Sequence, residues 1–299
     1  MKRRAFLLRS SSATAAATTP LSLIAQGGGS GSLPKPGEQP TIDVNVYLER
    51  WPFRRLPLDD SAALAAKLRE SGVTQAWAAS FDALLHRDLD AVNDRLAETC
   101  HEKGGASIFV PFGAVNPKLP GWRETLRRCH EVHRMRGIRL HPNYHGYTLA
   151  DPAFSALLAE AEKRNLTLQI AVRMEDTRTQ HPLVAAPDVD AMPLLDLLPR
   201  HKAGVRVQLL NSLRTLTDPL KISRLAALGA QFDIAMLEGT AGIERLVERK
   251  VPLAALAFGS YAPFFPIESS LLKLKESTLP AGRTVAIRCH NVENFLMRA

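Results

Sequence analysis

The chain has 299 residues, 45% of them hydrophobic and 23% charged, which excludes a disordered or fibrous protein and is typical of a globular one. Its formal net charge is +8, but the first 40 residues hold five basic residues and one acidic residue. The other 33 basic and 29 acidic residues nearly balance, and no nucleic-acid-binding motif is present, so we expect no nucleic-acid partner.

The N-terminal segment has the features of an export signal. Arg3-Arg4-Ala5-Phe6-Leu7-Leu8 contains the twin arginine and the Phe-Leu pair of a bacterial Tat signal. The mild apolar region that follows, 13–25, is shorter than the roughly 18 residues of a membrane span. We therefore expect residues 1–40 to be a Tat signal with a Gly/Ser/Pro-rich linker, and the processed protein to be periplasmic without membrane contact. A disordered basic leader on a cytoplasmic protein is the alternative.

Residues 41–299 alternate between short β-rich runs and helix-like stretches. The runs that we predict to be strands are 41–46, 74–79, 107–112, 137–141, 166–172, 205–210, 230–236 and 253–258. The predicted helices include 59–70, 88–102, 122–134 and 151–164, and another is expected to begin near Asp188. Strands rich in Val, Ile and Ala without strict alternation are typical of a parallel sheet buried on both faces. Eight such units predict one (β/α)₈ TIM barrel.

The cysteines do not indicate a metal site. Cys100, Cys129 and Cys289 lack the spacing of a metal knuckle. Cys100 and Cys129 fall on predicted helices, so we expect them to pack against apolar neighbours rather than to form a disulfide.

Several motifs resemble one known family. They are Ile42-Asp43-Val44-Asn45-Val46-Tyr47, Gly137-Ile138-Arg139-Leu140-His141-Pro142, Phe258-Gly259-Ser260-Tyr261-Ala262-Pro263 and His290-Asn291-Val292-Glu293-Asn294-Phe295-Leu296. On these motifs the chain resembles the amidohydrolase superfamily, especially the amidohydrolase-related branch that includes aminocarboxymuconate semialdehyde decarboxylase. The resemblance covers residues 41–298 and implies a metal-dependent hydrolase-like barrel.

The positions that the resemblance assigns to metal ligands hold other residue types. Asn45 and Tyr47 stand where the family has His-x-His after the first strand. Arg173 and Asn211 stand where histidines follow the fifth and sixth strands, and Tyr261 stands near the family's aspartate after the eighth. Zinc prefers imidazole, thiolate or carboxylate ligands, so amide, phenol and guanidinium groups are poor substitutes. We therefore expect the family's binuclear zinc centre to be absent.

The predicted mouth of the barrel nevertheless keeps many polar and aromatic side chains. We predict His141, His181 and Glu175 as catalytic residues, because a histidine near an acid suits proton transfer. The same side chains are the candidate ligands for one divalent metal ion such as zinc, and a site without metal is the equal alternative. Arginines at the mouth suit bidentate binding of a carboxylate or phosphate. The predicted substrate-binding residues are Asn45, Tyr47, Arg54, Tyr144, His145, Arg173, Arg178, Asn211 and Tyr261.

Structural interpretations of these residues remain open. Glu175 and Asp176 also fit a solvated network of ion pairs with neighbouring arginines. Tyr144 and His145 also fit ordinary loop packing. Polar loops at the carboxyl ends of barrel strands nevertheless favour a functional interpretation of the group as a whole.

Three classes of function are compatible with the sequence. The first is a hydrolase or non-oxidative decarboxylase acting on a small anionic organic substrate. The second is a catalytically inactive barrel that binds small molecules, and the third is a protein-interaction subunit using the aromatic rim around Trp51 and Phe264. The retained polar mouth favours the first. A small molecule is the expected partner, and a homo-oligomer is compatible with the sequence.

Overall fold

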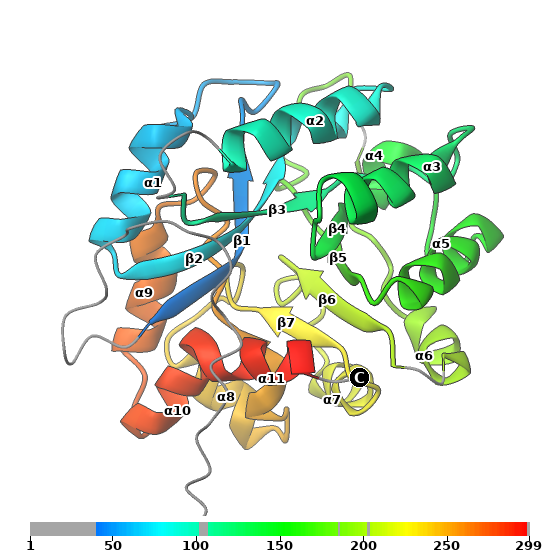
Figure 1. Cartoon of the computed structure of the whole chain (residues 1–299). Helices are drawn as coiled ribbons and strands as arrows, with labels where there is room; N and C mark the ends of the chain where they lie inside the picture. The colour runs from blue at the N-terminus through cyan, green and yellow to red at the C-terminus, as the bar shows by residue number, and fades with distance from the viewer. Residues whose placement is uncertain (1–39, 102–106, 185, 202–203, 298–299) are drawn as a thin grey trace, which may run out of the picture.

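The computed structural model describes residues 40–101, 107–184, 186–201 and 204–297, so the predicted export signal lies outside the described residues. Eight strands form one parallel sheet in the order β1-β2-β3-β4-β5-β6-β7-β8 (Figure 1). The strands are β1 Thr41–Leu48, β2 Val73–Ser80, β3 Phe109–Gly113, β4 Gly137–Leu140, β5 Thr167–Ala171, β6 Arg206–Leu210, β7 Gln231–Asp233 and β8 Leu256–Ala257. Val44 N donates to Phe258 O at 3.0 Å, which joins β1 to the end of β8. The predicted (β/α)₈ TIM barrel is confirmed.

The helices surround the strands on the outside of the barrel (Figure 1). The α-helices are α1 Ser61–Glu70, α2 Leu89–Cys100, α3 Trp122–Arg127, α4 Pro142–His145, α5 Pro152–Lys163, α6 Leu194–Leu197, α7 Pro219–Ala227, α8 Gly242–Glu248, α9 Ile267–Lys275, α10 Ala281–Val285 and α11 Asn291–Met297. The shorter segments are the 3₁₀ turns η1 Phe81–Leu84, η3 Leu198–Arg200 and η4 Leu253–Ala255 and the π-helical turns η2 Arg128–Val132 and η5 Ala286–His290. No helix in the described part of the chain has the length and apolar character needed to cross a membrane.

Helix α5 shows how the sequence builds the outer layer. The Asp151 side chain caps the helix by accepting a hydrogen bond from Ala153 N at 2.9 Å, and Pro152 occupies the first helical position. Apolar residues at a spacing of three and four form the face that packs on the barrel. These buried residues are Phe154, Leu157, Leu158 and Ala161.

A belt of polar side chains crosses the interior of the barrel. Arg139 Nε donates to Gln169 Oε1 at 2.8 Å, and Gln169 Nε2 donates to Gln208 Oε1 at 2.8 Å. Gln208 Nε2 donates to Gln231 Oε1 at 2.6 Å, and Gln231 Nε2 donates to Asn291 O at 3.0 Å. The belt therefore links β4, β5, β6 and β7 to the first residue of α11, and it satisfies polar groups that burial would otherwise make costly.

Asn291, from the C-terminal motif, also fixes the last strand. Its Nδ2 donates to Leu253 O and Leu256 O, both at 2.8 Å. These bonds attach α11 to η4 and β8, so the asparagine of this motif has a structural role at the amino end of the barrel.

The helix expected to begin near Asp188 begins at Leu194 instead, as α6, and the described residues between β5 and α6 form a loop. Asp188 cannot cap a helix there, because its carboxylate accepts from Arg173 Nε at 2.8 Å and Thr215 Oγ1 at 2.5 Å. Val189 N also donates to Val172 O at 2.9 Å, which holds the loop against the end of β5. The predicted start of the helix was wrong because Asp188 anchors the loop to Arg173 and Thr215.

Cys100, Cys129 and Cys289 are buried, and none forms a disulfide. Cys100 ends α2, and Cys129 lies in η2, where its Sγ is 3.3 Å from Asn93 Nδ2. The expectation that Cys100 and Cys129 serve packing rather than a disulfide is confirmed.

Candidate active site at the carboxyl end of the barrel

The carboxyl ends of the strands bring several predicted site residues together. Tyr47, on β1, places its Oη 2.9 Å from Nε2 of His141, which follows β4. The rings of Tyr47 and Tyr261 lie 5.7 Å apart, edge to face. Asn211, after β6, donates from Nδ2 to the carbonyl of Arg173, after β5, at 2.9 Å. The fold therefore places these five residues at the same end of the barrel.

Tyr47 and His141 form a fully buried polar pair. Burial raises the pKa of Tyr47 to about 12. Burial also lowers the pKa of His141 well below its usual value, and His145 and Arg139 lower it further. His141 is therefore neutral near pH 7, with Nε2 bonded to Tyr47 and with Nδ1 lacking a partner among the described residues.

Helix α4 places more unpartnered polar atoms beside this pair. The rings of His141 and His145 lie 5.8 Å apart. His145 Nε2 lies 2.8 Å from Ala83 O, and because a carbonyl only accepts, this nitrogen carries the proton. The Nδ1 of neutral His145 is then an acceptor, and neither it nor the buried Tyr144 hydroxyl has a partner in the described structure. Since buried polar atoms are normally hydrogen-bonded, this cluster indicates where polar groups of a ligand fit.

Arg139 supplies a fixed positive charge beneath the pair. It is fully buried, and its guanidinium carbon lies 4.6 Å from the centre of the Tyr47 ring. It donates to Val46 O at 2.7 Å and to Val44 O and Trp77 O at 3.0 Å, in addition to its bond with Gln169. All four acceptors are neutral, so the charge favours an anion bound at this end of the barrel.

A second polar layer lies deeper in the barrel. Asn45 Nδ2 donates to Asn211 Oδ1 and to Asp233 Oδ2, both at 2.8 Å. Asn211 N donates to Asp233 Oδ1 at 2.7 Å. Asp43 Oδ1 accepts from Asn45 N at 3.0 Å and from Ser260 N at 2.9 Å. Asn45 and Asn211, predicted to bind substrate, thus connect β1, β6 and β7 through Asp233, a residue that the sequence analysis missed.

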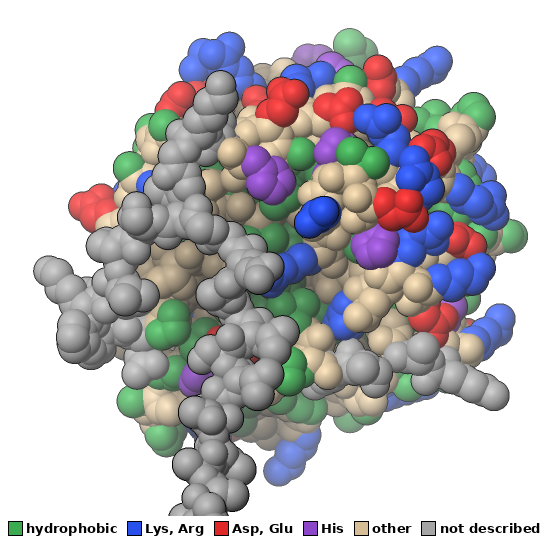
Figure 2. All heavy atoms as spheres, in the orientation of Figure 1, with side chains coloured by type: hydrophobic (Ala, Val, Ile, Leu, Met, Phe, Trp, Pro, Cys, Tyr) green, Lys and Arg blue, Asp and Glu red, His purple; other side chains and the backbone are tan. Residues whose placement is uncertain are grey.

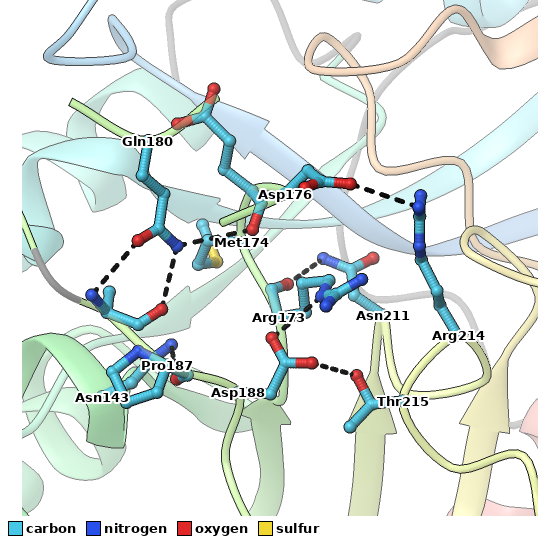
Figure 3. A network of polar contacts seen from close by, with 12 residues as sticks. Asn143, Arg173, Met174, Asp176, Gln180, Pro187, Asp188, Asn211, Arg214 and Thr215 are labelled. Carbon is cyan, nitrogen blue, oxygen red and sulfur yellow. Dashed lines mark hydrogen bonds and ion pairs between the residues drawn. The ribbon is translucent and has the colours of Figure 1, made fainter. Parts of the chain in front are cut away.

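The loop between β5 and α6 is anchored to its neighbours by polar contacts (Figure 3). Gln180 Nε2 donates to Ala186 O at 2.9 Å, and Asn143 Nδ2 donates to Pro187 O at 3.1 Å. His181, in the same loop, is exposed and stacks on Phe53 with ring centres 5.8 Å apart. The structure therefore places His181 on the outer rim, and no described contact joins it to His141 or Glu175.

The predicted anion-binding arginines each have an acidic partner. The pairs are Arg54–Glu175, Arg173–Asp188 and Arg178–Asp176. Arg214 adds a second contact to Asp176 (Figure 3). Glu175 is only 3% exposed, whereas Arg54 is 47% exposed and lies over the Phe264 ring. A substrate anion would therefore have to compete with a carboxylate for any of the three predicted arginines. Of the three, Arg54 is the one whose guanidinium group lies over an aromatic ring, that of Phe264.

The family model described as "Amidohydrolase" matches residues 47–230. The chain belongs to the amidohydrolase family. No curated protein sequence matches it. Solved structures with the same fold include 2,6-dihydroxybenzoate decarboxylase from Rhizobium, with a TM-score of 0.63, 14% identity and coverage of 85% of this chain and 98% of that chain.

Two other similar structures are also decarboxylases. 5-Carboxyvanillate decarboxylase from Sphingomonas paucimobilis has a TM-score of 0.65 and 11% identity, with 87% of this chain and 100% of that chain covered. Dihydroxybenzoic acid decarboxylase from Polaromonas sp. JS666, with bound manganese and the inhibitor 2-nitroresorcinol, has a TM-score of 0.65 and 12% identity, with 86% and 97% covered. At these identities the likeness of this amidohydrolase to them shows the fold.

Among the described residues, the side chains at the mouth of this amidohydrolase barrel do not form a group of three histidine, cysteine or carboxylate ligands for a metal ion. His141, Glu175 and His181, the predicted donors, do not form a group that could share an ion in the part of the chain that the structure describes. The described residues contain one group of histidine, cysteine and carboxylate ligand atoms within 4.8 Å of one another. It lies in η5 and α11 and consists of Cys289, His290 and Glu293.

Close packing around Asp233 makes Gly259 a sensitive position of the amidohydrolase. A Cβ at Gly259 would lie 2.7 Å from Asp233 Oδ2 and 2.8 Å from Asp233 Cβ. We expect Gly259→Ala to lower the free energy of unfolding by about 1–3 kcal/mol, as overpacking of a core does. Gly282→Ala is the matched control, because no atom beyond its chain neighbours and the backbone of its own helix lies within 4 Å of the added Cβ. Urea unfolding measures both, and equal stability of the two variants would contradict the described packing.

Proposed function

We propose that this amidohydrolase binds a small aromatic carboxylic acid at the carboxyl end of its barrel and catalyses non-oxidative decarboxylation. The observation that carries the proposal is the buried Tyr47–His141 pair, in which His141 Nδ1 lacks a partner beside the equally unpartnered Nδ1 of His145. Aromatic side chains around the pair suit a planar ring. They are Trp51, Phe81 and Phe264, in contact with one another and with the two tyrosines at the mouth.

The chemistry needs one proton and no oxidant. The bond between the ring carbon and the carboxylate breaks, its electron pair takes up a proton, and CO₂ leaves. Neutral His141 gains that proton when the substrate carboxylate binds, because a nearby anion raises the pKa of an imidazole. The imidazolium then donates from Nδ1 to the ring carbon, while Tyr47 Oη holds Nε2 and fixes the ring.

Two arginines suit the binding of the acid. Buried Arg139 makes the potential beneath Tyr47 positive. Arg54 is half exposed, so it can exchange the Glu175 carboxylate for that of the substrate. Solved structures of the same fold include decarboxylases of hydroxybenzoic and carboxyvanillic acids, which supports this class of substrate.

The second candidate is a catalytically inactive barrel that binds a small acid. It is favoured by the ion pairs that engage Arg54, Arg173 and Arg178, and by the lack of an assembled donor group for metal at the mouth in the described residues. This candidate predicts saturable binding of an aromatic acid with no release of CO₂.

The test measures CO₂ release and calorimetric binding for the full chain with 2,6-dihydroxybenzoate, 5-carboxyvanillate and benzoate. We expect turnover without added metal and proton uptake on binding. We also expect His141→Ala to lower kcat by about 10²–10⁴-fold, the usual contribution of a general acid. His86→Ala, a change at an exposed histidine, is the control.

Binding without CO₂ release would establish the second candidate, and the absence of both would refute the proposed function. Elemental analysis of the purified protein is expected to find at most one divalent ion per chain and no binuclear zinc centre.

We further propose that residues 1–40 direct Tat export and that residues 41–299 are the periplasmic barrel. The support is the twin-arginine motif. Replacing Arg3 and Arg4 by lysine is expected to retain the protein in the cytoplasm, and fractionation of the native host measures this. Equal amounts of the wild-type protein and of the lysine variant in the periplasm would refute the proposed Tat export.

A further inference from the structure

We infer that the amino end of the barrel carries a second site, which binds an organic diphosphate such as a nucleoside diphosphate. A cavity of about 550 Å³ lies at the amino ends of β4, β5 and β6, the opposite end of these strands from the candidate active site. Its wall contains four arginines and one histidine. They are Arg134, Arg136, Arg164, Arg206 and His130.

The charge of this wall is strongly positive, because no acidic residue lines the cavity. Arg134 and Arg136 are exposed, and neither forms an ion pair with a described residue. Arg164 is bonded to Glu160 at 2.5 Å, so its charge is compensated in part. The side chains of Arg134 and Arg136 are therefore the ones available to an anion.

Arg206 has a fixed orientation in the wall. Its side chain donates to Asn165 O, to Leu296 O at 3.2 Å and to Thr167 Oγ1 at 3.3 Å. Because its Nε, Nη1 and Nη2 atoms already donate to protein acceptors, Arg206 contributes a fixed positive charge to the wall, while Arg134 and Arg136 supply the donors. In the view of Figure 2, basic side chains lie over β4 and β6, whereas acidic and basic side chains are mixed over α3 and α5.

The size and lining of the cavity select the class of ligand. A volume of about 550 Å³ is in the usual range for a small organic molecule and is larger than a single phosphate group needs. Met135, Leu166 and Leu296 line the same cavity and offer apolar contact to the organic part. Guanidinium groups match phosphate oxygens in bidentate geometry, and several of them suit two linked phosphates.

The site does not depend on the proposed function. Residues at the amino end of a TIM barrel normally serve stability, whereas catalysis takes place at the carboxyl end. A ligand at this cavity would therefore bind without contact to His141, and His141→Ala should leave its affinity unchanged.

Calorimetric titration of the full chain with ADP, AMP and adenosine, at about 150 mM salt, tests the inference. We expect ADP to bind at least about tenfold more tightly than AMP and adenosine not to bind. Arg134→Gln/Arg136→Gln should weaken ADP binding at least about tenfold. The control Arg87→Gln/Arg224→Gln removes two exposed arginines that form no described ion pair elsewhere, and should change the affinity less than about twofold.

Thermal unfolding establishes that both double variants fold. The inference is overturned if the wild-type chain shows no saturable ADP binding up to about 5 mM. It is also overturned if the two double variants bind ADP equally, since the effect would then reflect net charge alone. Loss of ADP binding in His141→Ala would contradict the placement of the ligand at the amino end.

Discussion

Replacement of Arg139 by methionine is expected to lower the free energy of unfolding by about 4 kcal/mol or more. The guanidinium group is fully buried and donates to three main-chain carbonyls and to the Gln169 side chain. Each buried acceptor left without a partner costs about 1–3 kcal/mol. Gln169 also donates to Val44 O, so this carbonyl keeps a partner in the variant. The total loss of stability is therefore smaller than four unpartnered acceptors would cause.

Urea unfolding of the full chain measures this loss. Arg224→Met is the control, because Arg224 is exposed and has no described ion pair, and its replacement should change stability by less than about 0.5 kcal/mol. Arg139→Lys should recover only part of the loss, since an ammonium group cannot reach acceptors from β1, β2 and β5 together. A stability of Arg139→Met within about 1 kcal/mol of the wild type would show that the described network contributes little.

The order of strands could be predicted because every strand of this barrel is a short apolar run between two helix-like stretches. The ends of the strands were harder to predict. The run 253–258 was expected to be one strand, but only Leu256–Ala257 pairs with β7. Leu253–Ala255 forms a turn after Pro252, and Phe258 N donates to Ile287 O instead of to a strand. Apolar composition indicates burial, but it does not tell which backbone group each residue bonds.

The site could be predicted in part for a similar reason. His141 and Tyr261 were identified as site candidates because polar residues that directly follow barrel strands converge at one end. Arg139 and Asp233 received no role, because the presence of a charged residue within an apolar strand does not by itself show whether it faces the interior of the barrel. Alternation along the strand would have helped, since Arg139 is two residues before His141 and shares its face.

The pair Arg178–Asp176 is one that the sequence suggested, whereas the partner of Arg54 could not be predicted from it. Arg54 and Glu175 are 121 positions apart and meet only because the loops after β1 and β5 converge. From the sequence, the expected partners of Glu175 and Asp176 were the neighbouring arginines; Asp176 has such a partner in Arg178, but Glu175 pairs with Arg54. Long-range charge pairing depends on the geometry of the barrel mouth, which composition and spacing do not contain.

The second large effect is expected from Asp43→Asn and depends on pH. Burial raises the pKa of Asp43 from 3.8 to about 7 and outweighs the hydrogen bonds from Asn45 N and Ser260 N, which lower it. Because the pKa is higher in the folded state than in the unfolded chain, the folded state binds this proton more tightly. The bound proton makes its whole contribution to the free energy of unfolding below about pH 4. This contribution decreases as the pH rises and is lost once the pH has passed about 7.

Between pH 5 and pH 8 the wild-type protein should therefore lose about 2–3 kcal/mol more stability than Asp43→Asn. Asparagine at this position remains neutral at every pH and keeps the Oδ1 acceptor. Its amide nitrogen takes the place of Asp43 Oδ2, an atom that has no partner in the described structure. Urea unfolding at several pH values measures both curves, with Asp196→Asn, an exposed position on α6, as the control. Parallel curves for the wild type and Asp43→Asn would mean that the carboxylate stays ionised throughout, and that the interior of the barrel stabilises its charge better than the described contacts imply.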